Sequence, residues 1–229
     1  MTTGDKNIEG LFALLPYFTP QEKDLVWQNT TSKVYRKGEF VFQEGDSPVA
    51  LKYLTSGKVK VFKQGVGGRA QILRLVSSWG LLGFRGLLAN EPHFTTAQAM
   101  EPSLVCHVDR TCMQSIINSN SKLTAAMVNF MAGTLGFSYW RTVSLTQKHI
   151  RGRVADALLI LSNIYGFEED GTTMRACFSR EDIASLSNMT TANAIRTLSA
   201  FQDEQIVKLE RRRIQILDPQ KVHRISELG

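Results

Sequence analysis

Residues 178–198 read FSREDIASLSNMTTANAIRTL and carry the signals of two short helices joined by a turn. Ser179, with Asp182 three residues later, predicts a capping box in which Asp stands where Glu or Gln is usual. Asn188 lies where the turn needs a residue that tolerates left-handed backbone, and Thr190 predicts the N-cap of the second helix. We therefore expect a helix-turn-helix with helices over 180–186 and 191–201.

The second helix has one face for its own domain and one for a partner. The face that we expect to point inward carries Ala194, Ile195 and Leu198. The outer face offers Thr191, Asn193, Arg196 and Thr197. The N-terminal residues of such a helix reach base edges in the major groove, where Arg suits guanine and Asn suits adenine. A solvated helix face is the alternative for these polar residues.

A β pair over 206–209 and 214–217 follows, and its connection contains an arginine run. A basic hairpin tip of this kind can lie along DNA phosphates as a wing, and a plain solvated turn is the alternative. The DNA-binding residues that we predict are Ser179, Arg180, Thr190, Thr191, Asn193, Arg196, Thr197, Arg211, Arg212 and Arg213.

The chain before this domain has two further textures. From residue 33 to about residue 109, β-type runs alternate with glycine-containing turns every 8–12 residues or so, which favours an antiparallel sandwich or barrel. Residues 121–147 contain no Pro and predict one long helix. Its narrow apolar stripe is typical of pairing with a second copy, although packing on its own domain is the alternative. The predicted dimer-interface residues are Leu123, Met127, Phe130, Met131, Leu135, Thr142 and Leu145.

Several segments occur in the order and spacing of a known family. They are residues 36–45 (RKGEFVFQEG), 54–61 (LTSGKVKV), 80–83 (GLLG), 153–159 (RVADALL), the helix-turn-helix and 214–219 (IQILDP). Over about residues 20–220 the chain resembles the cyclic AMP receptor protein/Fnr family of bacterial transcription factors. The resemblance implies an α+β fold: an N-terminal β-roll (a double-stranded jelly roll, like a cyclic-nucleotide-binding domain), a long dimerisation helix and a C-terminal winged helix-turn-helix.

The resemblance also implies domain limits and partners. We expect an N-terminal arm over 1–20, a β-roll sensor domain over 21–120, a dimerisation helix over 121–147 and a DNA-binding domain over 148–229. The expected partners are a second copy of the chain and double-stranded DNA with a two-fold site. RNA polymerase and a small-molecule effector of unknown identity are further candidates.

The effector pocket implied by the resemblance departs from the members that bind cyclic AMP. Where those members use Glu and Arg for the ribose and phosphate, this chain has Phe84 and Thr95. Losing the Arg removes a charge-assisted, bidentate partner for phosphate, so we do not expect cyclic AMP to be the effector. Arg85, near a helix start that favours anions, could serve another anion or be a surface residue. The pocket residues carried over are Gly83, Phe84, Arg85, Thr95, Thr96, Ser138 and Tyr139.

No cofactor or metal site is predicted. The cysteine cluster of the iron–sulfur members is missing, because residues 1–50 contain no Cys. Haem stays open through His93, Cys106 and His107. No Cys/His set has the spacing of a zinc site. No nucleophile–base set or phosphate loop occurs either, so we expect no catalytic residue and no enzyme.

Composition and charge limit the function further. The net charge is +6 over 229 residues, but residues 151–229 carry 11 basic and 11 acidic side chains. Binding of DNA by this part of the chain would therefore depend on where the arginines lie rather than on its net charge. No apolar run approaches the 18 or so residues of a membrane helix, so we expect a cytoplasmic protein without a membrane partner. A homodimeric transcription regulator is the leading function. A ligand-binding (anion or haem) regulatory module whose main role is not DNA binding is the alternative.

Overall fold

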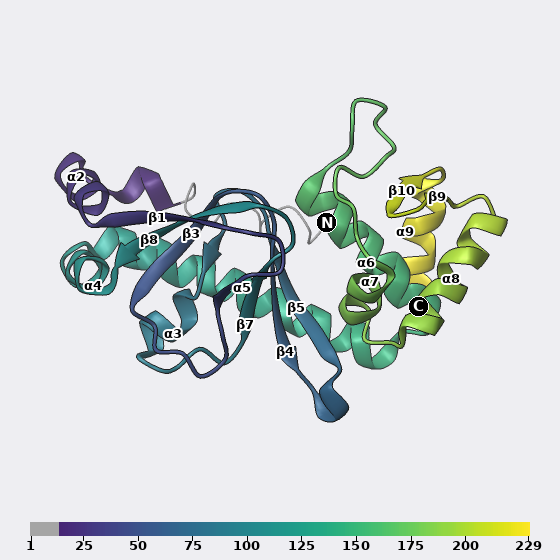
Figure 1. Ribbon diagram of the computed structural model, residues 1–229, viewed down its shortest axis with the longest axis horizontal. Coiled ribbons are helices and arrows are strands. Elements are labelled where there is room, and N and C mark those ends of the chain that lie inside the picture. Colours follow the sequence, from purple (N-terminus) through teal and green to yellow (C-terminus); the bar gives the residue numbers. More distant parts are fainter. Residues whose placement is uncertain (1–13) are drawn as a thin grey trace. The chain divides into compact units, whose positions relative to one another are not determined.

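The computed structural model describes residues 14–229 (Figure 1). Their backbone forms two compact units: residues 14–63 with 73–136, and residues 64–72 with 137–229. The first unit contains most of the predicted β-roll and the second contains the helix-turn-helix. Residues 1–13 of the predicted N-terminal arm lie outside the described residues.

The predicted β region forms two antiparallel sheets. One four-stranded sheet has the order β1-β8-β3-β6, and another has the order β2-β7-β4-β5. A short antiparallel pair, β9 and β10, stands in the DNA-binding part. The strands are β1 (Thr30–Tyr35), β2 (Phe40–Phe42), β3 (Ala50–Ser56), β4 (Val59–Gln64), β5 (Ala70–Val76), β6 (Leu81–Leu82), β7 (Thr96–Ala99), β8 (Ser103–Asp109), β9 (Val207–Glu210) and β10 (Arg213–Ile216).

Apolar cores cover both faces of strand β3, because successive side chains of a strand point to opposite faces. Leu54 belongs to a core with Val59 and Val105. Leu51 belongs to a second core, which includes Met113 and joins the sheet to helices. The sheet that contains β3 therefore packs against the second sheet on one face and against helices on the other. The packing of the two sheets is the sandwich that the spacing of the β-type runs predicts.

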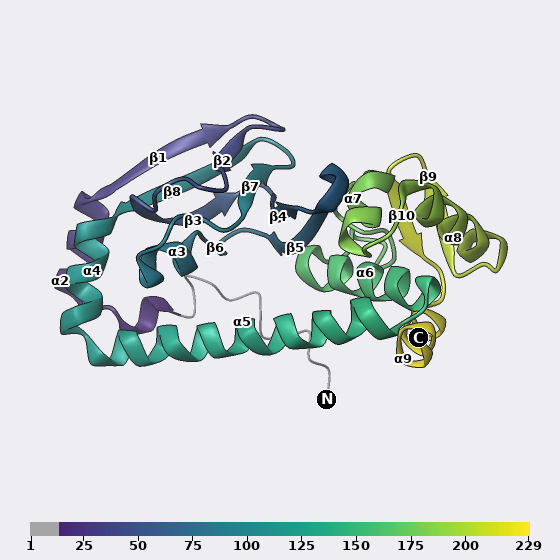
Figure 2. The same ribbon diagram turned by 90° about the horizontal axis from the view of Figure 1, so that it is seen from below.

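The helices complete both units. They are η1 (Leu15–Tyr17), α2 (Pro20–Gln28), η2 (Val66–Gly68), α3 (Phe84–Ala89), α4 (Arg110–Ser119), α5 (Ser121–Gln147), α6 (Ile150–Tyr165), α7 (Arg180–Leu186), α8 (Thr191–Asp203) and α9 (Pro219–Leu228). The predicted long helix is continuous as the 27-residue α5 (Figure 2). Among the described residues, no helix has the length and apolarity needed to span a membrane.

The apolar stripe of α5 divides between two tasks. Leu123 and Met127 are buried in the core of the β-roll, and Phe130 packs against that core. Leu123 and Met127, two of the predicted dimer-interface residues, therefore face the core of their own domain, and half-buried Phe130 contacts the same core. The exposed apolar residues of α5 recur at steps of three and four and are Val128, Met131, Leu135, Tyr139 and Val143.

Candidate nucleic-acid interface

The first helix of the predicted motif, α7, begins with the expected capping box. The Ser179 hydroxyl accepts a hydrogen bond from the Asp182 N–H at 3.0 Å. In return, the Asp182 carboxylate accepts from the Ser179 N–H at 3.3 Å and from its hydroxyl at 2.6 Å. Ser179 thus satisfies backbone groups that a helix start leaves unpaired, and its hydroxyl is committed to the fold.

The turn and the second helix also follow the local signals. Asn188 has a left-handed backbone with φ of 49°, a conformation that Asn tolerates better than most residues. The Thr190 hydroxyl accepts a hydrogen bond from the Asn193 N–H at 3.3 Å and caps α8. The sequence therefore predicts the boundaries of α7 and the start of α8 correctly.

The buried face of α8 differs from the predicted one at Ile195, Thr197 and Phe201. Ala194, Thr197, Leu198 and Phe201 are buried, a helical stripe at steps of three, one and three. Thr197 is only 8% exposed, so its expected place on the outer face is wrong. Ile195, expected inside, is 47% exposed.

The outer face of α8 is the surface that can meet a base edge. It exposes Thr191, Ile195 and Arg196, while Asn193 is half-buried. One Arg196 nitrogen donates to the Asn193 side-chain oxygen at 3.2 Å, which orients both side chains. Ile195 was missed by sequence reasoning, although an apolar residue at this place can contact a thymine methyl group. The first turn of α8 carries no acidic residue that would repel phosphate.

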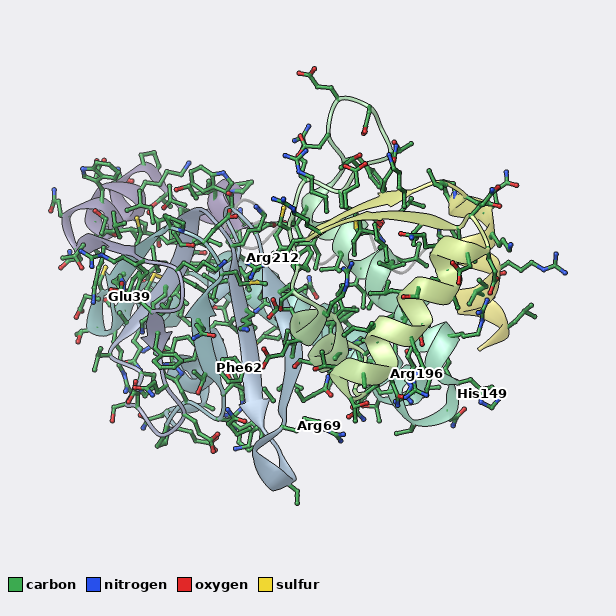
Figure 3. The ribbon with its side chains drawn as sticks, turned by 45° about the vertical axis from the view of Figure 1, so that its right-hand side comes forward. Glu39, Phe62, Arg69, His149, Arg196 and Arg212 are labelled. Atoms are coloured by element: carbon green, nitrogen blue, oxygen red, sulfur yellow. The ribbon has the colours of Figure 1, made fainter. Side chains whose placement is uncertain are left out.

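The arginine run lies at the tip of the β9–β10 hairpin. Arg211, Arg212 and Arg213 are all exposed, and Arg212 lies apart from Arg196 (Figure 3). Arg180 donates to the Arg211 carbonyl at 3.2 Å, and burial lowers the pKa of Arg180. Arg180 therefore fastens the wing to α7 as well as being a predicted DNA ligand.

Two arginines that sequence reasoning missed hold the end of α7. Buried Arg141 of α5 donates to the Leu186 carbonyl, and Arg153 of α6 donates to the Asn188 carbonyl at 2.9 Å. Burial lowers the pKa of Arg141 to about 10. Cations at a helix C-terminus donate hydrogen bonds to its free carbonyls and interact favourably with the helix dipole. The recognition helix is therefore positioned through its preceding turn.

The residues predicted for an effector pocket come from several elements of both compact units. Gly83 begins α3 with φ of 70°, and Phe84 is buried edge-on against Phe130, with ring centroids 5.1 Å apart. Arg85 is exposed and pairs with Glu91. The hydroxyl of half-buried Thr96 accepts from the Glu44 N–H at 3.1 Å, and Thr95 is half-buried. Ser138 and Tyr139 belong to the other compact unit.

A cation that the sequence did not single out lies beside Phe84. The Arg74 guanidinium lies 5.2 Å from the Phe84 ring centroid and 5.9 Å from that of Phe130. It donates to the Leu81 carbonyl at 3.1 Å, and burial lowers its pKa to about 10. Its position depends on sheet pairing, which local sequence signals do not reveal.

The three residues named for haem are each engaged separately. Buried His93 stacks on Phe42 with ring centroids 3.9 Å apart. The His107 ring nitrogen lies 3.1 Å from the Tyr35 hydroxyl, and the Cys106 sulfur lies 3.3 Å from the Thr55 hydroxyl. Residues 14–229 bring no three metal-ligating side chains together.

Comparisons with known proteins match both parts of the chain. Residues 32–120 match the family model of the cyclic nucleotide-binding domain, and residues 152–225 match that of the Crp-like helix-turn-helix domain. Electron transport regulator A of Shewanella oneidensis is 25% identical over 85% of this chain and 78% of its own. Transcriptional activator protein Anr of Pseudomonas protegens is 26% identical over 80% of this chain and 75% of its own.

Solved structures share the fold. FixK2 from Bradyrhizobium japonicum superposes with a TM-score of 0.77 at 23% identity, over 86% of this chain and 96% of its own. A Crp/Fnr family regulator from Eubacterium rectale gives a TM-score of 0.75 at 20% identity, over 93% of this chain and 97% of its own.

Proposed function

Because the chain belongs to the Crp/Fnr family of bacterial DNA-binding transcription regulators, we propose that it works as a homodimer on a two-fold DNA site. Its two helix-turn-helix units would then lie in successive major grooves, and a change in their relative orientation would control transcription. We place this activity in the cytoplasm, where bacterial DNA is found, and assign the protein no catalytic role. RNA polymerase is a candidate partner.

The outward face of α8 is the observation that carries the proposal. Arg196 and Ile195 are exposed on a helix whose start is capped and whose other face is buried. An Arg on this face can make a bidentate contact with guanine that is worth about 1–3 kcal/mol. Replacing Arg196 would remove this contact without disturbing the core, because the side chain is exposed.

The test compares Arg196→Ala with Arg224→Ala, an exposed arginine of α9 in the same unit. A binding-site selection first defines the preferred duplex, and fluorescence anisotropy then measures affinity. We expect Arg196→Ala to lose about 1–3 kcal/mol on the selected duplex and to relax the preference at one position in each half-site. Unchanged affinity and preference would remove Arg196 from base recognition. If the wild type binds no DNA, the alternative of a regulatory module without DNA binding is favoured.

The exposed stripe of α5 supports the homodimer. Met131, Leu135 and Tyr139 present apolar surface at helical spacing on one chain. A narrow stripe of this kind suits a helix that pairs with its own copy. A second α5 helix would remove the stripe from water.

The surroundings of Phe84 argue against cyclic AMP as the effector. Phe84 packs in the core where the cyclic-AMP-binding members have a polar contact, and Thr95 replaces their arginine. Binding of cyclic AMP would therefore lack its main phosphate partner. We expect calorimetry to give a dissociation constant weaker than about 10 μM, or a free energy less favourable than about −7 kcal/mol. Tighter binding would refute this part of the proposal.

A further inference from the structure

The hairpin between β4 and β5 ends beside the helix-turn-helix. Residues 64–72 belong to the same compact unit as residues 137–229. An Arg69 nitrogen donates to the Asn188 side-chain oxygen at 3.4 Å, and the Gln71 amide donates to the Leu186 carbonyl at 3.5 Å. The Arg69 side chain extends from the hairpin toward the DNA-binding helices (Figure 3). The end of the hairpin therefore contacts the turn that precedes α8.

Arg69 brings positive charge to this location. Its side chain is exposed, and no ion pair within residues 14–229 neutralises it. Its hydrogen bond to Asn188 goes to a neutral amide and uses one of the five N–H donors of a guanidinium. The remaining donors form a planar fork that matches the oxygens of a phosphate.

The turn marks where a DNA backbone would pass. Asn188 lies two residues before Thr190, the N-cap of α8. When the second helix of such a motif enters the major groove, its first residues reach the bases and the preceding helix crosses the backbone. The connection between the two helices therefore lies at the rim of the groove, close to the phosphates.

We propose that Arg69 is a further DNA ligand, a guanidinium that binds a backbone phosphate next to the recognition helix. The inference extends the proposed function and depends on it, and it adds a contact from outside the winged helix-turn-helix. A phosphate contact fixes the position of the protein on the duplex but carries no base information. Arg69 should therefore strengthen binding to every duplex.

The experiment measures anisotropy titrations of Arg69→Ala, Arg69→Lys and Arg36→Ala on two duplexes of equal length. One duplex carries the selected site and the other an unrelated sequence. Arg36 is an exposed arginine of the other compact unit and serves as the matched control. Circular dichroism verifies that each variant is folded.

We expect Arg69→Ala to weaken binding to both duplexes by a similar factor. Each lost phosphate contact lowers the slope of log affinity against log salt by about 0.9, so its effect shrinks about 3.5-fold between about 50 and 200 mM salt. Arg69→Lys, which keeps the charge but loses the planar fork, should lose less affinity than Arg69→Ala, and Arg36→Ala should match the wild type.

Three results would overturn the inference. Unchanged affinity and salt slope in Arg69→Ala would show that no phosphate is bound. Tighter binding would show that the hairpin restrains the turn instead. A loss confined to the selected duplex would indicate base recognition. If the wild type binds neither duplex, the proposed function itself fails, which is a different result from a silent Arg69 in a protein that binds DNA.

Discussion

Replacing Asp156 by Ala should weaken the packing of helices α5, α6 and α9 in the DNA-binding unit. Asp156 is a carboxylate in α6 with 1% exposure. Its oxygens accept hydrogen bonds from the Ser144 hydroxyl of α5 and the Ser226 hydroxyl of α9. The Lys148 ammonium lies 2.9 Å from both oxygens. One carboxylate therefore joins three helices.

The size of the effect follows from what the substitution leaves behind. Removing one partner of a buried ion pair costs about 3–5 kcal/mol, because the other charge stays without compensation. The Lys148 side chain is 20% exposed, so its ammonium can turn toward water and the cost lies at the lower end. We expect a loss of about 3 kcal/mol in the local stability of α6, which corresponds to an increase of about 100-fold in its opening constant.

Native-state hydrogen exchange of the α6 amides measures this opening. The matched control is Asp203→Ala, which removes an exposed carboxylate at the end of α8 and should stay within about 0.5 kcal/mol of the wild type. Asp156→Asn, which keeps an acceptor but loses the charge, should fall between the two. If exchange in Asp156→Ala rises no more than in Asp203→Ala, the three-helix role of this carboxylate is refuted.

Two further predictions concern the β-roll and the dimer. Burial, with the charge of Lys52, lowers the pKa of His93 to about 4, whereas the unfolded chain titrates near about 6.5. The unfolded state therefore takes up the proton first as the pH falls, and up to about 3 kcal/mol of stability should disappear between about pH 6.5 and pH 4. Urea unfolding midpoints should fall over this range in the wild type and fall less in His93→Gln, and equal slopes would contradict the prediction. Leu135→Glu, on the exposed stripe of α5, should convert a dimer to a monomer in sedimentation, while Gln147→Glu at the end of the same helix should not; a dimeric Leu135→Glu would argue against pairing through this stripe.

The sequence predicted features whose causes are local. The caps Ser179 and Thr190 fix where α7 and α8 begin, because each satisfies N–H groups within the next three residues. The faces of α8 were harder to predict, because both Ile195 and Thr197 fit a helix and only packing against neighbouring elements decides which of them is buried.

Features that depend on tertiary partners were outside the reach of sequence patterns. The stripe of α5 was visible, but periodicity does not say that Leu123 meets the β-roll while Leu135 stays exposed. Arg74 and Asp156 became noticeable only once sheet pairing and helix packing gave them neighbours. The residues predicted for the effector pocket came from family likeness, and here Phe84 is part of a core.

In the helix-turn-helix, the residues that face outward differ from those that hold the fold together. The motif is therefore a suitable scaffold for altered DNA specificity. Thr191, Ile195 and Arg196 are exposed, so a library at these positions could be screened for new target sites with little loss of folded protein. Ser179 and Arg180 look equally polar in the sequence, but they hold the cap and the wing in place. A designer should keep those two residues fixed and vary only the outward face.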